Sequence, residues 1–224
     1  MGNLYAIENG SLRVVVSDAG AEMQDIVLKE SGEPLLWGGD PAVWKGRAPW
    51  LFPVIGRLKD DYYTYRGARY DMAMHGFARK AVFAAEQAGA DAVRFTLRDS
   101  AQTLAVYPWR FELAVEYSLS GKRLDIRCAV SNRDEKPMLF SLGAHPGFLC
   151  REGDRLRFEG LDSLTCRRLT ADGHLLRLTG DAVPLEAHAL PLEAALFEDD
   201  AMIFERPAAT RLTLLRARGA SVRS

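Results

Sequence analysis

The sequence has no long apolar run and no excess of charge of either sign. Its 224 residues include no stretch close to the roughly 20 apolar residues that span a bilayer, and no apolar segment opens the chain. The 29 Lys and Arg residues against 30 Asp and Glu residues leave a formal net charge of −1, so no global field favours nucleic acid or an anionic membrane. We therefore expect neither nucleic acid nor a membrane as a partner.

Cysteine is scarce as well. The 3 cysteines, Cys128, Cys150 and Cys166, lie far apart and show no CxxC spacing. An odd count without such spacing argues against a disulfide framework and for a reducing compartment, so we expect a cytoplasmic protein. Cys128 falls on the apolar side of an alternating strand pattern, and we expect it to be a small core residue.

A two-residue periodicity runs through much of the chain. Apolar and polar residues alternate over 111–119 and 124–130, which predicts two long antiparallel strands with one apolar face each. Other strands are expected at 4–7, 11–16, 23–28, 92–98, 156–158, 164–169, 202–204 and 212–215, with a hairpin at 60–70. The one helix candidate covers residues 99–106, with Asp99 or Ser100 as its N-cap. Strands throughout predict an all-β sandwich in a single domain spanning residues 1–224.

Residues 37–57 break this pattern, because they mix glycines, prolines and tryptophans without any period. Irregular passages of this kind either pack over the end of a sheet or line a ligand site. A flat aromatic ring can stack on the C–H face of a sugar. Of Trp37, Trp44 and Trp50, we expect about one to face a ligand.

One histidine stands in an unusual setting. Residues 141–148 place His145 between small residues and Pro146, directly after an apolar run. Proline pushes the preceding residue toward an extended backbone, and Gly143 and Gly147 permit close approach of backbone or ligand. An imidazole held in such a turn suits proton exchange with a small molecule near neutral pH. The alternative is a histidine that only ties down the turn by hydrogen bonding.

A second histidine, His75, favours the functional interpretation. It precedes Gly76 and Phe77, so that both histidines are followed by glycine and an aromatic residue within a few positions. Upstream, residues 51–57 form an apolar strand that ends in Gly-Arg. A lone His-Gly pair is a weak signal of a functional site. The segments that contain His145, His75 and Arg57 are a much stronger signal when taken together.

Five segments carry a resemblance to a known family. They are WKGRAPWLFPVIGR at 44–57, MHGFAR at 74–79, YPWRF at 107–111, SLGAHPGF at 141–148 and LFEDDAMIF at 196–204. In this order they resemble the aldose 1-epimerase (galactose mutarotase) family, in particular its bacterial branch of sugar epimerase-like proteins. The resemblance implies a galactose mutarotase-like β-sandwich (a supersandwich) of antiparallel strands. It also implies an isomerase that interconverts the α and β anomers of an aldohexose by acid–base ring opening.

The same resemblance implies roles for individual residues. His145 corresponds to the general acid at the ring oxygen, and Arg57 and His75 correspond to residues that bind sugar hydroxyls. Asp200 occupies the position of the substrate-binding aspartate, with Asp199 beside it as a competing candidate.

We expect no metal and no cofactor. His75 and His145 could be read as metal ligands, but no His/Cys/Asp triplet at ligand spacing accompanies them. His174 and His188 lie in polar, turn-rich contexts, and we expect both on the surface.

The chain departs from the family toward its C-terminus. The family's general base is a glutamate in a Glu-Pro-Trp-like stretch beyond residues 211–215, and this sequence contains no such stretch. We therefore expect a sandwich that is incomplete at the C-terminus. Its unpaired edge near 210–215 would make the chain less stable or lead it to form a homodimer through that edge.

Two other functions remain open at this point. A chain with the pocket but without the base would be a non-catalytic carbohydrate-binding protein. Alternatively, the substrate would be a hexose 6-phosphate, for which Arg47 and Arg79 are candidate members of an arginine-rich rim.

Overall fold

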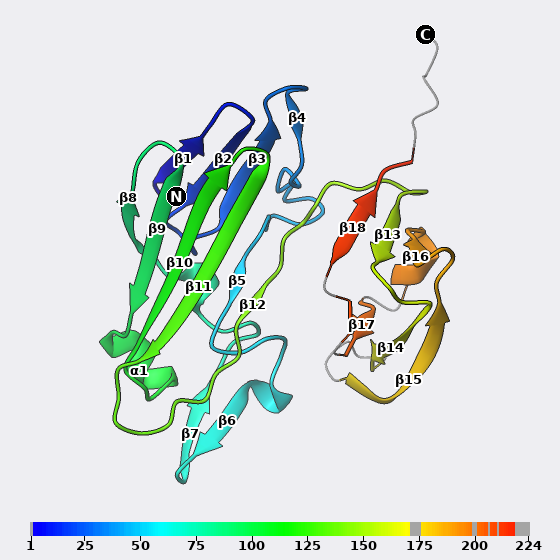
Figure 1. The fold of residues 1–224 in the computed structure, drawn as a ribbon. Coiled ribbons are helices and arrows are strands. Elements are labelled where there is room, and N and C mark those ends of the chain that lie inside the picture. The colour runs from blue at the N-terminus through cyan, green and yellow to red at the C-terminus, as the bar shows by residue number, and fades with distance from the viewer. Residues whose placement is uncertain (1, 171–175, 199–200, 206, 210, 218–224) are drawn as a thin grey trace. The chain divides into compact units, whose positions relative to one another are not determined.

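The computed structural model describes residues 2–170, 176–198, 201–205, 207–209 and 211–217. They form two compact units, Met1–Leu149 and Cys150–Ser224. Strands dominate both units (Figure 1), which confirms the predicted all-β class. The single domain expected for residues 1–224 stays a prediction, because two compact units can still unfold together as one cooperative domain.

The first sheet of the N-terminal unit is an antiparallel meander of four strands. Its order is β1 (Leu4–Glu8), β2 (Leu12–Ser17), β3 (Met23–Leu28) and β4 (Glu33–Pro34). Asn9 holds the turn between the first two strands. Its Oδ1 accepts hydrogen bonds from the backbone N–H groups of Ser11 and Leu12, at 2.8 and 2.9 Å. The Asn-Gly hairpin therefore forms where the sequence predicts it.

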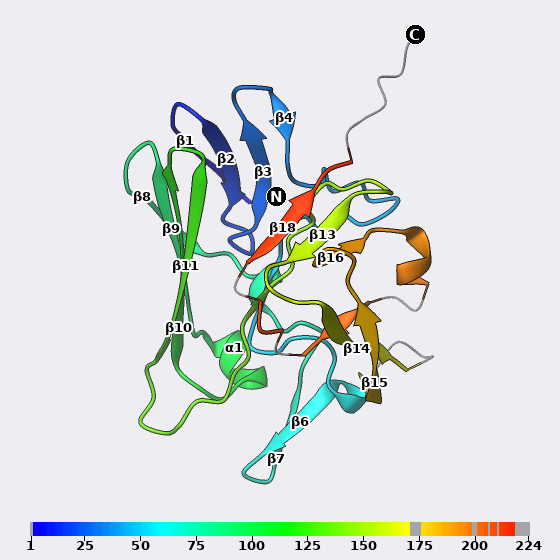
Figure 2. The same ribbon diagram turned by 45° about the vertical axis from the view of Figure 1, so that its right-hand side comes forward.

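The second sheet is antiparallel and contains the two longest strands. Its order is β11 (Arg123–Asn132), β10 (Phe111–Ser120), β9 (Ala92–Arg98) and β8 (Ala84–Gln87). The strands lie side by side in both views (Figures 1 and 2). Of these four strands, the sequence pattern missed only β8, which is mostly exposed and therefore lacks an apolar face.

The core of this unit lies between the two sheets. Every second residue of β10 is buried, and Phe111, Leu113 and Val115 are 0% exposed. The sheets are also joined by a buried polar link, because Trp50 Nε1 donates to the hydroxyl of Tyr117 at 2.7 Å and this hydroxyl donates to a backbone carbonyl of the first sheet's connecting turn at 2.7 Å. Trp50 is thus a core residue.

The expectation that Cys128 is a core residue is wrong. It points to the same side as the buried Val115 opposite it, yet it is exposed. The reason is its position on β11, an edge strand whose only strand neighbour in the described part of the chain is β10. Alternation identifies the apolar face of a strand, but whether another layer covers that face depends on its place in the sheet.

Shorter elements connect the sheets. The helix α1 (Ala101–Val106) begins at Ser100, which forms a capping box with Thr103, as the N-cap pattern predicts. The remaining elements of this unit are η1 (Lys59–Asp61), the hairpin β6 (Tyr62–Tyr65) and β7 (Ala68–Asp71), η2 (Ala78–Lys80), and the short pair β5 (Trp50–Leu51) and β12 (Gly143–Ala144).

The C-terminal unit contains two three-stranded sheets. One has β13 (Arg155–Phe158) between β16 (Ala189–Pro191) and β18 (Leu212–Leu215); the other has β14 (Ser163–Leu169) between β15 (Leu176–Pro184) and β17 (Ile203–Phe204), and η3 (Ala194–Phe197) is its short helix. The sequence pattern predicted four of these strands but missed β15 and β16. Most residues of β15 are exposed, so no apolar alternation marks it.

Two absences among the described residues bear on function. No helix there has the length and apolar character that a membrane span requires. The same residues contain no group of three or more His, Cys, Asp and Glu side chains that could hold a metal ion.

Candidate active site

The segment that carries His145 is paired along its length with the irregular passage upstream of Arg57. Gly143 and Ala144 pair with β5, and the backbone N–H of His145 donates to the carbonyl of Pro49 at 3.0 Å. Gly147 continues this pairing by donating to the carbonyl of Arg47 at 2.7 Å. The extended backbone that Pro146 favours therefore becomes one strand of a short ladder, and the ladder fixes the position of His145.

Trp44 lies against the ring of His145. The two ring centroids are 5.1 Å apart, with 37° between the ring planes. The indole N–H of Trp37 donates to the carbonyl of Trp44 at 2.6 Å. Gly147 leaves room for the indole, since a Cβ there would approach Trp44 to 2.8 Å. Of the three tryptophans, Trp44 is thus the one beside the predicted catalytic histidine.

His75 is held in a backbone conformation that few side chains adopt. Its φ is 67°, and the φ of Gly76 is 71°. Gly76 packs against the segment that precedes Arg57, because a Cβ on Gly76 would lie 2.1 Å from the carbonyl oxygen of Phe52. Left-handed backbone at a residue other than glycine costs free energy and persists only where surrounding contacts enforce it.

The enforcing contacts are two hydrogen bonds with Gly56. The N–H of His75 donates to the carbonyl of Gly56 at 2.8 Å, and the N–H of Gly56 donates to Nδ1 of His75 at 3.0 Å. Because Nδ1 accepts, the proton of the neutral ring is on Nε2. Burial lowers the pKa of His75, and the nearby Arg79 and His145 lower it further. His75 is therefore a neutral hydrogen-bond donor near pH 7.

The two imidazoles are neighbours. Their ring centroids are 6.1 Å apart, but their surroundings differ, because His75 is half-buried and His145 is exposed. One ring is tied to a backbone amide through Nδ1, whereas the other is bordered by an indole. The pair can thus offer a fixed N–H donor and a solvent-accessible proton carrier to one ligand.

Two arginines line an open hollow of about 400 Å³ next to this pair. Arg57 Nη1 forms an exposed ion pair with Asp61 at 3.2 Å. Arg79 Nε is enclosed and has no hydrogen-bond partner among the described residues. A buried N–H without a partner costs free energy. This N–H therefore favours a bound ligand that supplies a hydrogen-bond acceptor.

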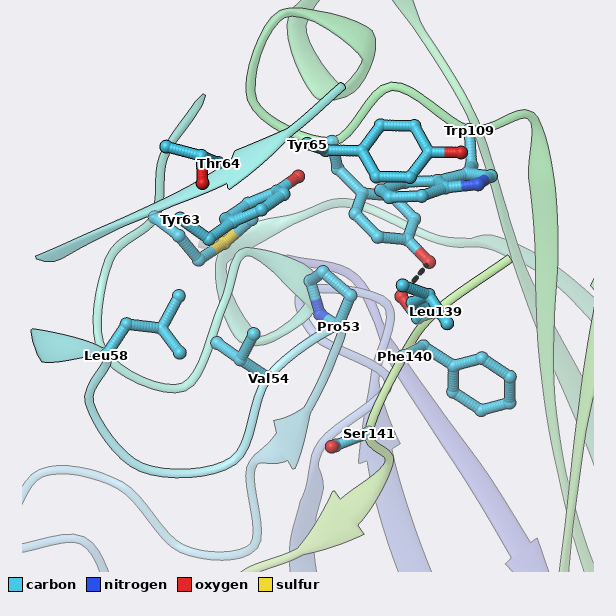
Figure 3. A pocket seen from close by; sticks show the side chains of 12 residues that line it. Pro53, Val54, Leu58, Tyr63, Thr64, Tyr65, Trp109, Leu139, Phe140 and Ser141 are labelled. Atoms are coloured by element: carbon cyan, nitrogen blue, oxygen red, sulfur yellow. Dashed lines mark hydrogen bonds between the residues drawn. The ribbon is translucent and has the colours of Figure 1, made fainter. Parts of the chain in front are cut away.

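A second cavity on the same unit has a different character (Figure 3). It holds about 300 Å³ and is lined largely by aromatic and aliphatic side chains. The polar groups of three of its rings are used internally, because Tyr63, Tyr107 and Trp109 each donate to a backbone carbonyl at 2.8 to 2.9 Å. A sugar needs several free polar partners, so we place the candidate sugar site at the histidine pair and not in this cavity.

The structure brings together three of the four predicted site residues. Arg57, His75 and His145 all belong to the N-terminal unit, with His75 bonded to the residue that precedes Arg57. Asp200 and its competitor Asp199 lie outside the described residues, and the role of Asp200 stays a prediction.

Two features of the site were missed in the sequence. One is the contact of Trp44 with His145, and the other is the amide of Gly56 that sets the tautomer of His75. Neither has a local signal, since both depend on segments that meet only in the folded chain. His188 is exposed, as expected, and His174 lies outside the described residues.

Known proteins resemble this chain in sequence and in structure. The family described as Aldose 1-epimerase matches residues 3–198. Protein LacX, plasmid, from Lactococcus lactis subsp. lactis is 34% identical over an alignment of 185 residues, and the match covers 77% of this chain and 62% of that protein. The chain therefore spans less than two thirds of the length of the curated relatives it matches.

Two solved structures share the fold. A galactose mutarotase related enzyme from Lactobacillus acidophilus has 34% identity and a TM-score of 0.85, covering 91% of this chain and 69% of that one. A galactose mutarotase-like protein from Lactobacillus casei ATCC 334 has 31% identity and a TM-score of 0.88, covering 96% and 76%. They confirm the galactose mutarotase-like fold that the sequence predicts.

Proposed function

Because the chain belongs to the aldose 1-epimerase family, we propose that it interconverts the α and β anomers of an aldohexose by acid–base ring opening. The supporting observation is the histidine pair, with ring centroids 6.1 Å apart and different hydrogen-bonding roles. The proposed setting is the cytoplasm, in keeping with three cysteines that lack pairing spacing.

In the proposed reaction, His145 donates a proton to the ring oxygen while the C1 hydroxyl loses one. The bond between C1 and the ring oxygen breaks, and the open-chain aldehyde forms. Rotation about the C1–C2 bond then presents the other face of the carbonyl, and the reverse proton transfers close the ring. The indole of Trp44, whose ring centroid lies 5.1 Å from that of His145, borders the imidazole and limits the orientations it can adopt.

His75 and Arg57 orient the sugar in this proposal. The Nε2–H of His75 donates to a sugar hydroxyl, and its direction is set because Nδ1 is bound to the amide of Gly56. The guanidinium of Arg57 offers further donors, and Asp200 would accept from another hydroxyl. A fixed N–H donor costs no reorganisation when the substrate binds.

The proton of the C1 hydroxyl needs an acceptor. Mutarotation already proceeds slowly in water, so solvent is the acceptor in the minimal form of the proposal. A positioned general acid alone accelerates such a step by about 10²-fold or more.

Polarimetry of freshly dissolved α-glucose and α-galactose tests this function. We expect the 224-residue chain to shorten the equilibration time. His145→Ala should lower the enzymatic rate at least about 10²-fold. His188→Ala is the matched control, because it removes an exposed imidazole of the C-terminal unit. Equilibration at the rate of buffer alone would remove the catalytic claim for this chain.

A second candidate is a carbohydrate-binding protein without catalysis, because the fixed Nε2–H donor of His75 can hold a sugar hydroxyl without any transfer of a proton. Titration calorimetry with glucose and galactose separates this function from the first. Heat of binding together with an unchanged rate of mutarotation would support it. Loss of that heat in His75→Ala, but not in His188→Ala, would locate the sugar at the histidine pair.

A third candidate is an epimerase for hexose 6-phosphates, which the enclosed Nε of Arg79 favours. Arg47 is less suitable than the sequence suggested, because its Nη1 already donates to the carbonyl of Gln24 at 2.7 Å. Tighter binding of glucose 6-phosphate than of glucose, abolished by Arg79→Met, would support this substrate. Arg13→Met, at an exposed position on β2, is the control.

A further inference from the structure

Gly147, two residues after His145, is hydrogen-bonded to a different segment on each side. Its N–H donates to the carbonyl of Arg47 at 2.7 Å, and its carbonyl accepts from the backbone N–H of Trp37 at 2.7 Å. An isolated bridge at the next residue continues the second pairing. The segment that carries His145 is therefore held between the residues around Arg47 and the residues around Trp37.

Trp37 makes a second hydrogen bond with its side chain. Its indole N–H donates to the carbonyl of Trp44 at 2.6 Å, while its backbone N–H is the group that reaches Gly147. Trp37 is half-buried, and a hydrogen bond that is partly shielded from water is electrostatically stronger than an exposed one. One residue thus connects the segment that carries His145 to the residue whose ring borders this histidine.

Two glycines form a slot for the indole of Trp44. A Cβ on Gly46 would lie 2.8 Å from Cε2 and Cζ2 of this ring, and a Cβ on Gly147 would lie 2.8 Å from its Cζ3. Because contacts this short are sterically forbidden, any larger residue at either position would move the ring. The backbone N–H of Trp44 also donates to the carbonyl of Asp40 at 2.8 Å, which closes the preceding turn. These contacts confine the indole to one place beside His145.

We propose that Trp37 is a positioning residue for the general acid and that it acts through Trp44. The inference rests on the proposed function, in which His145 donates a proton to the ring oxygen. The two hydrogen bonds of Trp37 set the separation between the segment of His145 and the indole of Trp44, whose ring centroid lies 5.1 Å from that of the imidazole. A catalytic group misplaced by about 1 Å can lose on the order of 10² in rate, so this separation affects proton transfer.

The two histidines are held by different means. Nδ1 of His75 is bonded to the amide of Gly56, and such a bond favours one tautomer of the ring. The imidazole of His145 is bordered by an indole, and packing against a flat ring restrains an imidazole without occupying either ring nitrogen. This restraint suits a group that must lose and regain a proton in each catalytic cycle.

Trp37→Phe tests the role of the indole N–H, because it retains an aromatic side chain and the backbone bond to Gly147. We expect kcat for mutarotation to fall on the order of 10-fold while KM changes little, since Arg57 and His75 still bind the sugar. Trp109→Phe is the matched control, because this indole N–H also donates to a backbone carbonyl, at 2.8 Å, and its ring lines the second cavity. The control should leave kcat unchanged.

A double-mutant cycle shows whether Trp37 acts through Trp44. Trp44→Ala should lower kcat at least as much as Trp37→Phe, and the double variant should be no slower than Trp44→Ala alone. Gly147→Ala should resemble Trp44→Ala, because the new methyl group would displace the indole. If the two losses multiply in the double variant, Trp37 acts by another route and the proposal is overturned.

NMR of the His145 imidazole tests the positioning independently of catalysis. The indole of Trp44 shifts the resonances of the imidazole C–H protons, which His145→Ala identifies. We expect Trp37→Phe to move these resonances toward their positions in Trp44→Ala, and Trp109→Phe to leave them in place. A chain that shows these shifts but no mutarotase activity would remove the proposed function and retain the positioning role. Unmoved resonances in Trp37→Phe would overturn the proposal whether or not the chain is active.

Discussion

The two compact units differ most in what they bury. The N-terminal unit has a continuous core between two four-stranded sheets, in which residues such as Phe52, Phe95 and Phe111 are 0% exposed. The core cluster of the C-terminal unit consists of Phe158, Leu164, Leu185 and Leu190. A small unit buries a smaller fraction of its apolar surface, so its stability is more marginal.

This difference explains where the candidate site lies. His75 and Gly76 hold left-handed backbone and close contacts that only a well-packed neighbourhood enforces. The core of the N-terminal unit supplies that support, because Gly76 forms an isolated β-bridge with the fully buried Phe52. The long strand β15 of the other unit is mostly exposed and has no comparable support.

The largest expected effect is on the core of the N-terminal unit. Phe111→Ala should lower the free energy of unfolding by about 3–5 kcal/mol, whereas Leu164→Ala in the smaller core should cost about 2 kcal/mol, the low end for its type. Phe197→Ala, at a side chain that is 50% exposed, is the control and should have little effect. Hydrogen exchange assigns each loss of protection to a unit. If both core variants deprotect both units equally, the units form one cooperative domain as the sequence predicts.

A smaller effect is expected from a matched pair of glycines. Gly76 and Gly160 both have positive φ, at 71° and 78°, so alanine should cost about 1–2 kcal/mol at each from backbone strain alone. At Gly76 the new Cβ would also strike the carbonyl of Phe52, whereas nothing lies within 4 Å at Gly160. We therefore expect Gly76→Ala to destabilise more and to displace His75.

Thermal unfolding and mutarotation rates check this pair. Gly160→Ala should retain activity at a temperature below its transition, and Gly76→Ala should lose activity even when folded. Equal stability losses in the two variants would show that the contact with Phe52 relaxes easily. The packing around Gly76 would then hold the backbone no more tightly than the open surroundings of Gly160 do.

The smallest expected effect is a dependence on pH. Since the pKa of His75 is lowered in the folded chain, the unfolded chain takes up this proton first as the pH falls below about 6.5. The free energy of unfolding should therefore decrease from that pH downward and should be insensitive to this group above it. His75→Asn keeps an acceptor for the amide of Gly56 but does not titrate, so it should reduce the slope.

Hydrogen exchange between about pH 5 and 8 measures this slope for each unit separately. Amides of β13 in the C-terminal unit serve as the internal reference, because they report any acid dependence that does not come from His75. An unchanged slope in the N-terminal unit of His75→Asn would mean that the ring is not held neutral by its surroundings.

Local patterns predicted much of the fold. The alternation in β9, β10 and β11, the Asn-Gly turn at Asn9 and the cap at Ser100 each concern residues close together in the chain. These signals depend on backbone periodicity and turn chemistry, which a sequence displays directly. Strands without an apolar face, such as β8 and β15, carry no such signal and were missed.

The candidate site was predicted only in part. The local settings of His145 and His75 singled them out, the family resemblance gave the roles of Arg57, His75 and His145, and the structure brings their segments together. The contact of Trp44 with His145 and the environment of Cys128 did not follow from either pattern or resemblance.

The sequence by itself determined which residues can exchange protons and which segments become strands, because both depend on side-chain chemistry and local backbone preference. Tertiary structure alone decided that His75 is neutral with its proton on Nε2, that an indole borders His145, and that β11 has β10 as its one strand neighbour in the described part of the chain. The physical reason is that burial, hydrogen-bond partners and sheet position are properties of segments brought together by folding. A pKa or an exposed fraction depends on those neighbours, and no local stretch of sequence contains them.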